Sequence, residues 1–296
     1  MTTEVDNLRQ TLFLLSPSWH GATLLSMLLG NHSRVYSCGD TIPARTPFRC
    51  RCGKSSDACA FWTEVRQRVG VSGADSVIPA RPSITGYRSF DHGLVLLGSS
   101  LARYLHLPAP GCGQVIRAHS IFLDCCSESK PFDIFVDGCK SISRYAAIKS
   151  GRRERIRGIL HLIRDPRAFA AAAKKRGISA DDACRYWAQQ HRRIDRVAAL
   201  LGEDVMTLRY EDFCAAPEVT LQRIQVWLKL MPESLLKPFG RDRHWTGSGS
   251  VRKFDGTVEL SDRWRTELTR QEIALLRRKL QKTARRWGYR LDQDCI

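Results

Sequence analysis

The chain has 296 residues, of which 43% are hydrophobic and 26% are charged, as in ordinary globular proteins. This length and composition exclude disorder, a collagen-like repeat and a coiled coil as the main architecture, and leave room for a substantial core. The 47 Lys and Arg against 30 Asp and Glu give a net charge of +17. Such an excess predicts a polyanionic partner, with a basic surface that only aids solubility as the alternative.

The sequence has no apolar run of the ~18 residues that a membrane span needs. The first ten residues, MTTEVDNLRQ, lack a basic region followed by an apolar stretch, so they do not form a secretory signal. We therefore expect a cytoplasmic protein without a membrane span, in which most of the 11 cysteines are reduced.

Short apolar runs alternate with stretches of helical periodicity, which predicts βαβ units and a parallel sheet. The first strand is Thr11 to Leu15, followed by a loop and a short helix from about Thr23 to Leu29. Four further strands are predicted at Val35 to Ser37, Ile134 to Asp137, Ile159 to Ile163 and Val205 to Leu208.

Helices are predicted between and after these strands. They lie near Phe61, over 91–106 and 112–128, after Arg167, from Ser179, from Pro217 to Leu228 and from Thr269 to Trp287. The fold class is therefore α/β: a three-layer α/β/α arrangement around a central parallel sheet of about five strands, similar to P-loop nucleotide-binding folds. We expect one domain over 1–296 with an irregular, cysteine-containing insertion at about 41–90.

The strand, loop and helix at 11–29 predict an anion site. Ala22 and Thr23 open a helix whose first N–H groups point outward, and Gly21 lets a phosphate approach the backbone. The loop has no lysine in the place that the triphosphatase motif G-x-x-x-x-G-K-[ST] requires, which disfavours a kinase or triphosphatase. Taken alone, such a loop is also compatible with plain packing.

Five segments, in order along the chain, carry a family resemblance. They read SWHGATLL at 18–25, CRCG with a later C-x-F-W at 50–62, VDGCK at 136–140, HLIRDPRA at 161–168 and LRYEDF at 208–213. Together they resemble the sulfotransferases that use 3'-phosphoadenosine-5'-phosphosulfate (PAPS), whose motifs run roughly P-[RK]-S-G-[ST]-T-L-L, V-D-x-S-K, R-D-P-R-A and R-Y-E-D. The resemblance extends from residue 11 to about 265.

The resemblance implies a binding site for PAPS and its product, adenosine 3',5'-bisphosphate. Arg164, at the end of a predicted strand, is expected to clamp the 3'-phosphate, with Arg167 as a weaker partner. Tyr210 is expected near the 3'-phosphate or adenine, or as a buried structural residue. The first loop would hold the 5'-phosphosulfate and a late loop would close over the nucleotide, through Trp19, His20, Gly21, Ala22, Thr23, Leu24, Arg252 and Lys253.

Three residues are candidates for the transfer of the sulfuryl group itself. Asp40 would take the proton of the acceptor, although a Gly-Asp pair is also common in turns. Lys140 would reach the sulfonate or the bisphosphate, the alternative being a solvated lysine. His20 would replace the cation of the family's loop or serve a structural role. This chemistry requires no metal, and we expect none.

Two positions depart from the family's pattern. Trp19 stands where the loop has Arg or Lys, and Ala172 stands where the 3'-phosphate site has Ser. The leading hypothesis is a PAPS-dependent sulfotransferase acting on a hydroxyl or amine of a small molecule or glycan. The alternative is a catalytically degenerate sulfotransferase fold that binds a nucleotide or polyanion.

Two further features are weighed on composition and spacing. Cys38, Cys50, Cys52 and Cys59 suggest zinc, but the C-x-C spacing favours a disulfide or buried thiols. The basic C-terminal helix spreads its charges over more than one face, so we expect no nucleic-acid partner. The acceptor and the oligomeric state stay open.

Overall fold

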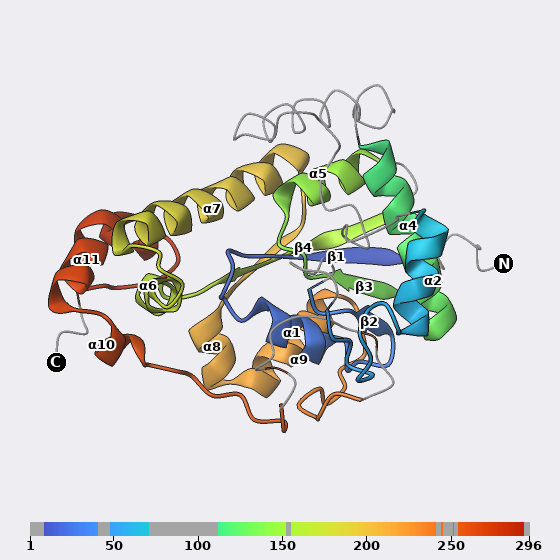
Figure 1. The fold of residues 1–296 in the computed structure, drawn as a ribbon. Coiled ribbons are helices and arrows are strands. Elements are labelled where there is room, and N and C mark those ends of the chain that lie inside the picture. The colour runs from blue at the N-terminus through green and yellow to red at the C-terminus, as the bar shows by residue number, and fades with distance from the viewer. Residues whose placement is uncertain are drawn as a thin grey trace.

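The computed structural model describes residues 9–40, 48–70, 112–151, 155–240, 244, 251 and 254–292. One parallel sheet has the strand order β2-β3-β1-β4-β5 (Figure 1). The three-layer α/β/α class and all five predicted strands are confirmed. The strands are β1 (Gln10–Leu15), β2 (Val35–Ser37), β3 (Ile134–Asp137), β4 (Arg155–Ile163) and β5 (Val205–Arg209).

Strand β4 begins ahead of the predicted Ile159. Its first three residues, Arg155, Ile156 and Arg157, are exposed or half-buried, and the two arginines interrupt the apolar pattern, yet Arg155 pairs in register with Gln10 of β1. The helices are α1 (Ala22–Leu29), α2 (Ala60–Val69), α4 (Gly113–Ser129), α5 (Ile142–Ser150), α6 (Pro166–Lys174), α7 (Ala180–Leu201), α8 (Tyr210–Ala215), α9 (Pro217–Trp227), α10 (Trp264–Glu267) and α11 (Arg270–Arg285).

Helices cover both faces of the sheet, as its buried strands require. In β1, Leu12 and Leu14 pack into the core under α1, α8 and α9, whereas Phe13 and Leu15 pack into the core under α5 and α7 (Figure 1). This alternation follows from the two-residue period of a strand. Both faces of β1 are therefore occupied by apolar packing.

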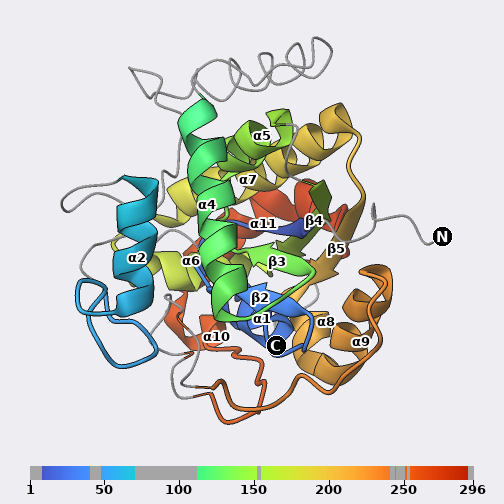
Figure 2. The same ribbon diagram turned by 90° about the vertical axis from the view of Figure 1, so that its right-hand side faces the viewer.

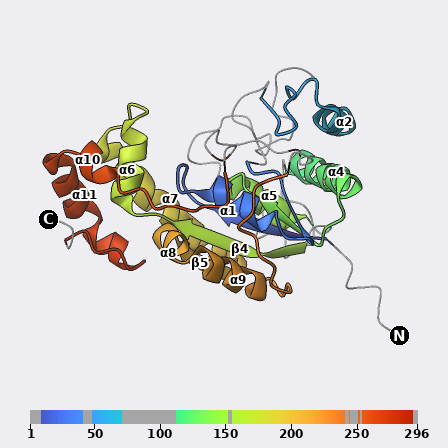
Figure 3. The same cartoon turned by 90° about the horizontal axis from the view of Figure 1, so that it is seen from below.

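Two further apolar clusters extend the fold beyond the sheet. Helices α2 and α4 lie side by side and enclose aromatic rings that include Phe61, Trp62 and Phe122 (Figure 2). At the opposite end, α6, α10 and α11 pack with α7 (Figure 3). The first cluster joins residues of the predicted insertion to β2, α4 and β3. Residues 41–47 and 71–90 of the insertion lie outside the described part, as does the helix predicted over 91–106.

Several predicted helix starts are confirmed by their caps. The Ser179 side chain accepts from the N–H of Asp182, and Thr269 forms a reciprocal capping box with Glu272. Helices α5 and α8 were not predicted, because both are short and begin directly after a strand or its turn. Among the described residues, no helix combines the length and hydropathy needed to cross a membrane.

Candidate functional site

The candidate site lies at the carboxyl edge of the sheet. All five strands are parallel, so the loops that follow β1, β2, β3 and β4 emerge on the same edge. Each loop delivers residues that the sequence predicted for the site. They are Gly21 to Leu24 after β1, Asp40 after β2, Lys140 after β3 and Arg164 after β4.

The loop after β1 ends in a left-handed glycine that starts helix α1. Gly21 has φ 85° and forms the N-cap, and no side chain caps the helix. The backbone N–H of Leu25 donates to the Gly21 carbonyl, which leaves the first N–H groups of the helix without an intrahelical partner. These groups form an anion site of the kind that phosphates occupy.

Tyr210 explains why a side chain is not tolerated at position 21 of this loop. A Cβ at Gly21 would lie 2.2 Å from Cε2 of Tyr210, far inside van der Waals contact. The Tyr210 ring therefore packs directly on the loop, and burial raises the pKa of its hydroxyl. Tyr210 is thus buried between the loop and Arg164, and its expected place near the 3'-phosphate or adenine stays a prediction.

Three side chains meet at this edge, one from the first turn of α1 and two from the turns after β2 and β3. The Thr23 hydroxyl donates to Asp40 Oδ1 at 3.0 Å, and the Lys140 ammonium donates to the same oxygen at 2.6 Å. The side chains of Asp40 and Lys140 are 27% and 18% exposed, so this group is partly open to solvent. The structure thus brings together Asp40, the predicted base, Lys140, the predicted cation, and Thr23, which is expected to contact the 5'-phosphate.

Close backbone contacts fix the turns that carry Asp40 and Lys140. A Cβ at Gly138 would lie 2.2 Å from the Gly39 carbonyl oxygen, so the two turns touch through glycine. Lys140 itself adopts φ 61°, a conformation that non-glycine residues seldom adopt and that concentrates at functional sites. The Gly39 N–H donates to the Ser37 hydroxyl at 3.0 Å. The position of the carboxylate and ammonium is therefore set by the fold.

A buried ion pair supports the turn below Lys140. The Arg144 guanidinium donates to Asp137 at 2.9 Å and to Nδ1 of His119 at 2.8 Å, and all three side chains are completely buried. Because arginine only donates, His119 is neutral with its proton on Nε2, which faces Thr11. Burial and the nearby Arg144 lower the pKa of His119 to about 3.

Arg164 lies against the first loop. Its guanidinium donates to the Trp19 carbonyl at 2.8 Å and covers the Tyr210 ring at 4.7 Å. The indole N–H of Trp187 in α7 donates to the Arg164 carbonyl at 2.9 Å. No described residue forms a hydrogen bond with the buried Nε of Arg164. The guanidinium is thus held beside the anion loop with hydrogen-bonding capacity left for a ligand.

Arg167 is placed differently from expectation. Its guanidinium is buried, forms a two-point ion pair with Asp165 and stacks on Trp264 at 4.3 Å. Asp165 also caps α6 by accepting from the Arg167 N–H. We therefore assign Arg167 to holding the start of α6, and leave it out of the set proposed to bind phosphate.

His20 also lies elsewhere than predicted. Its ring is completely buried, and Nδ1 donates to the Ser18 carbonyl at 2.9 Å. Nε2 must then accept, at 3.2 Å, from His191, whose other nitrogen accepts from His161 at 2.8 Å. Burial, reinforced by Arg164, lowers the pKa of His20 to about 3. This buried ring agrees with the structural role that the sequence left open for His20, and we leave His20 out of the residues proposed to act on the sulfonate.

The remaining predicted residues divide into described and undescribed ones. Trp19 has φ 63° and stacks with Phe169 at 5.8 Å, while Arg176 covers its ring. Arg252 and Lys253 lie outside the described residues. Sequence reasoning missed Trp187 and His191, since a helical period shows which residues share a face but not which loop that face contacts.

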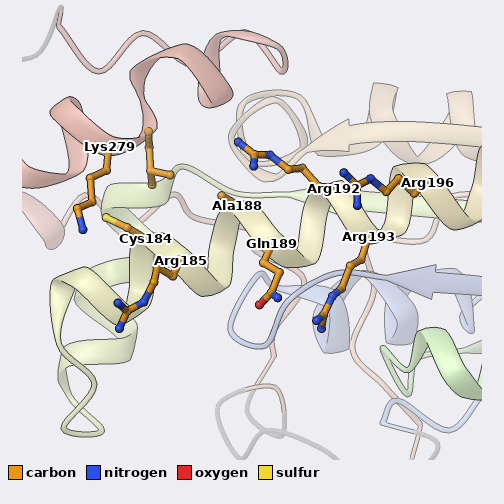
Figure 4. Close-up of a pocket in the computed structure, with 9 residues that line it drawn as sticks. Cys184, Arg185, Ala188, Gln189, Arg192, Arg193, Arg196 and Lys279 are labelled. Atoms are coloured by element: carbon orange, nitrogen blue, oxygen red, sulfur yellow. The ribbon is translucent and has the colours of Figure 1, made fainter. Parts of the chain in front are cut away.

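A hollow of about 640 Å³ lies apart from this edge, between α7 and α11 (Figure 4). Its basic side chains already have protein partners in several cases: Arg185 and Lys279 pair with Asp181, and Arg192 donates to Thr283. The absence of a nucleic-acid partner stays a prediction. The hollow is lined by Cys184, Arg185, Ala188, Gln189, Arg192, Arg193, Arg196, Lys279 and Leu280.

The fold matches that of sulfotransferases. The chain is similar to the sulfotransferase domain of the olefin synthase from Synechococcus PCC 7002, with a TM-score of 0.53, 17% identity and 98% of both chains covered. The sulfotransferase domain from the curacin biosynthetic pathway aligns at a TM-score of 0.47 and 15% identity, over 92% of this chain and 97% of that one. Neither family models nor curated proteins give a match to the sequence. The family fold expected from the sequence motifs is thus confirmed.

Proposed function

We propose that the protein is a sulfotransferase that moves a sulfuryl group from PAPS to a hydroxyl or amine of a small molecule or glycan. The observation that carries the proposal is the meeting of Thr23, Asp40 and Lys140 at the start of α1. Transfer from a phosphosulfate needs an anion site and a cation for the donor, with a base for the acceptor close by. This edge of the sheet has candidates for all three.

The donor substrate supplies an activated sulfonate, and the chain's residues position it and take up charge and proton. The N–H groups at the start of α1 and the Thr23 hydroxyl would hold its 5'-phosphate. The acceptor oxygen or nitrogen forms a bond to sulfur while the bond from sulfur to the phosphate oxygen breaks. Adenosine 3',5'-bisphosphate leaves with that electron pair, and Lys140 stabilises the charge that develops there.

Asp40 would accept the proton that the acceptor loses. Its carboxylate already accepts from Thr23 and Lys140 through one oxygen, Oδ1. Among the described residues, none forms a hydrogen bond with the second oxygen, Oδ2, which would orient the acceptor hydroxyl or amine. Arg164 is proposed to bind the 3'-phosphate through the nitrogens that it does not use on the Trp19 carbonyl.

A binding protein without turnover is the second candidate. It is supported by Trp19 in place of the loop cation, by the neutral state of His20, and by Ala172, which brings no hydroxyl to the 3'-phosphate site. This candidate shares the nucleotide site with the first and differs only in the transfer step.

The first test is a thermal shift with adenosine 3',5'-bisphosphate, with ATP as the control. At a hundredfold excess over Kd, a ligand stabilises a protein by about 2.7 kcal/mol, which raises Tm by several degrees. A shift with the bisphosphate alone supports the nucleotide site, and no shift with either ligand contradicts it. Product formation from PAPS with an acceptor panel then separates the transferase from the binding protein.

A further inference from the structure

Three cysteines and a histidine meet in the described part of the insertion, away from the proposed transfer site. The ligand atoms of Cys50, Cys52, Cys59 and His244 all lie within 4.8 Å of one another. The sequence brought Cys38 into this set, but Cys38 instead contacts Cys126 of α4. We propose that these four residues bind one structural zinc ion that joins the insertion to the C-terminal part of the chain.

The distances fit a tetrahedral site. With Zn–S near 2.3 Å and Zn–N near 2.05 Å, tetrahedral geometry separates two sulfurs by about 3.8 Å and a sulfur from a nitrogen by about 3.5 Å. In the structure, the Cys52 and Cys59 sulfurs are 3.7 Å apart, and His244 Nδ1 lies 3.7 Å from the Cys50 sulfur and 3.3 Å from that of Cys59. A disulfide between Cys52 and Cys59 would require about 2.05 Å.

The backbone builds a tight turn around the first two cysteines. The Cys50 N–H donates to the Lys54 carbonyl at 2.9 Å, and the Gly53 N–H donates to the Cys50 carbonyl at 3.1 Å. The turn requires φ 92° at residue 53, a backbone conformation that glycine adopts readily because it has no Cβ. An antiparallel bridge between Arg49 and Ser55 holds its ends. Both sulfurs are thereby presented on one side of a short hairpin.

Backbone N–H groups also face each of the three sulfurs. They belong to Cys52 for the Cys50 sulfur, to Lys54 for the Cys52 sulfur and to Trp62 for the Cys59 sulfur. Hydrogen bonds of this kind orient thiolate ligands and offset their charge in metal sites.

The histidine comes from a distant part of the sequence and is held in place by packing. The His244 ring stacks on Phe61 of α2 with centroids 4.8 Å apart and an angle of 7° between the planes. Close by, Arg51 donates to the Phe239 carbonyl at 3.1 Å, a second tie between the same two segments. Four protein ligands leave no open position, which is the mark of a structural and not a catalytic zinc site.

Metal analysis of the purified full-length chain tests the proposal. We expect about one zinc per chain in the wild type. Cys52→Ser and His244→Ala should each lose most of it, because either change removes one of four ligands. His244→Cys should retain the metal, since a four-cysteine set is also tetrahedral. Cys125→Ser is the matched control, because Cys125 is buried in the same apolar cluster but is not a ligand.

Cobalt substitution supplies an independent readout. The reduced, chelator-treated wild type should bind one Co²⁺ and show the visible bands of tetrahedral thiolate coordination, and His244→Ala should not reproduce that spectrum. A wild type that takes up neither zinc nor cobalt overturns the proposal. So does iron in place of zinc, or a Cys52–Cys59 disulfide found by mass spectrometry in unreduced protein. None of these outcomes depends on nucleotide binding or turnover, so the proposed function can stand or fall separately.

Discussion

The carboxyl edge of the sheet and the cysteine–histidine cluster hold their polar groups in different ways. At the edge, Thr23, Asp40 and Lys140 follow different strands, and the parallel topology alone brings them together. In the cluster, three ligands come from one short stretch, and the fourth, His244, comes from a distant part of the sequence and stacks on Phe61. The side chains of Asp40 and Lys140 are partly open to solvent, and the cluster has two buried and two half-buried ligands.

The largest expected effect is at Asp40. Asp40→Asn keeps an acceptor for Thr23 and Lys140 but cannot take a proton, so kcat should fall about 10²- to 10⁴-fold. Bisphosphate affinity and zinc content should stay unchanged, because the nucleotide loop and the cluster are intact. Steady-state kinetics with PAPS measures the loss, with the exposed Asp262→Asn as control. Wild-type turnover in Asp40→Asn would remove Asp40 from the mechanism.

The second-largest effect is expected for Arg164→Ala, which should weaken the binding of adenosine 3',5'-bisphosphate. The change removes charged hydrogen bonds to phosphate, which we expect to raise Kd about ten- to a hundredfold. Titration calorimetry measures it, and Arg223→Ala on the exposed face of α9 controls for the lost charge. Equal affinities for the two variants would show that the guanidinium serves only the loop and Tyr210.

Removal of zinc should have a smaller and differently distributed effect. Chelation should lower Tm by several degrees, since a ligand bound only to the native state stabilises it by mass action. Hydrogen exchange should rise around residues 48–70 and leave β1 and β4 unchanged. Calorimetry of Cys52→Ser, which should not respond to the chelator, provides the control. An equal fall in Cys52→Ser would assign the effect to the chelator itself.

Acid should lower the free energy of unfolding through the buried histidines near this edge. His20 and His119 have pKa values lowered to about 3, against about 6.5 when unfolded. Between these values the unfolded chain binds more protons, so stability falls as pH falls, by up to about 1.4 kcal/mol per pH unit for each histidine. Urea unfolding from pH 7 to 4 measures this slope. His119→Gln should reduce it, and an unchanged slope would show that His119 is protonated in the native state.

Much of the fold follows from the sequence, because buried strands are continuous apolar runs and caps such as Ser179 and Thr269 have clear signatures. Helices α5 and α8 were missed, since nine- and six-residue helices carry too little periodicity. The approach of Asp40 and Lys140 follows from topology. The placement of His20, Arg167 and His244 does not, because each depends on a tertiary neighbour that sequence spacing cannot identify.

The central position of β1 has a consequence for folding during synthesis. β1 ends at Leu15, but its two neighbours in the sheet begin at Ile134 and Arg155. During synthesis this apolar strand therefore leaves the ribosome long before either partner exists. Pairing between strands that are distant in the sequence slows folding and leaves aggregation-prone intermediates exposed. We expect the yield of soluble protein to improve when translation is slowed or when chaperones that shield apolar segments are supplied.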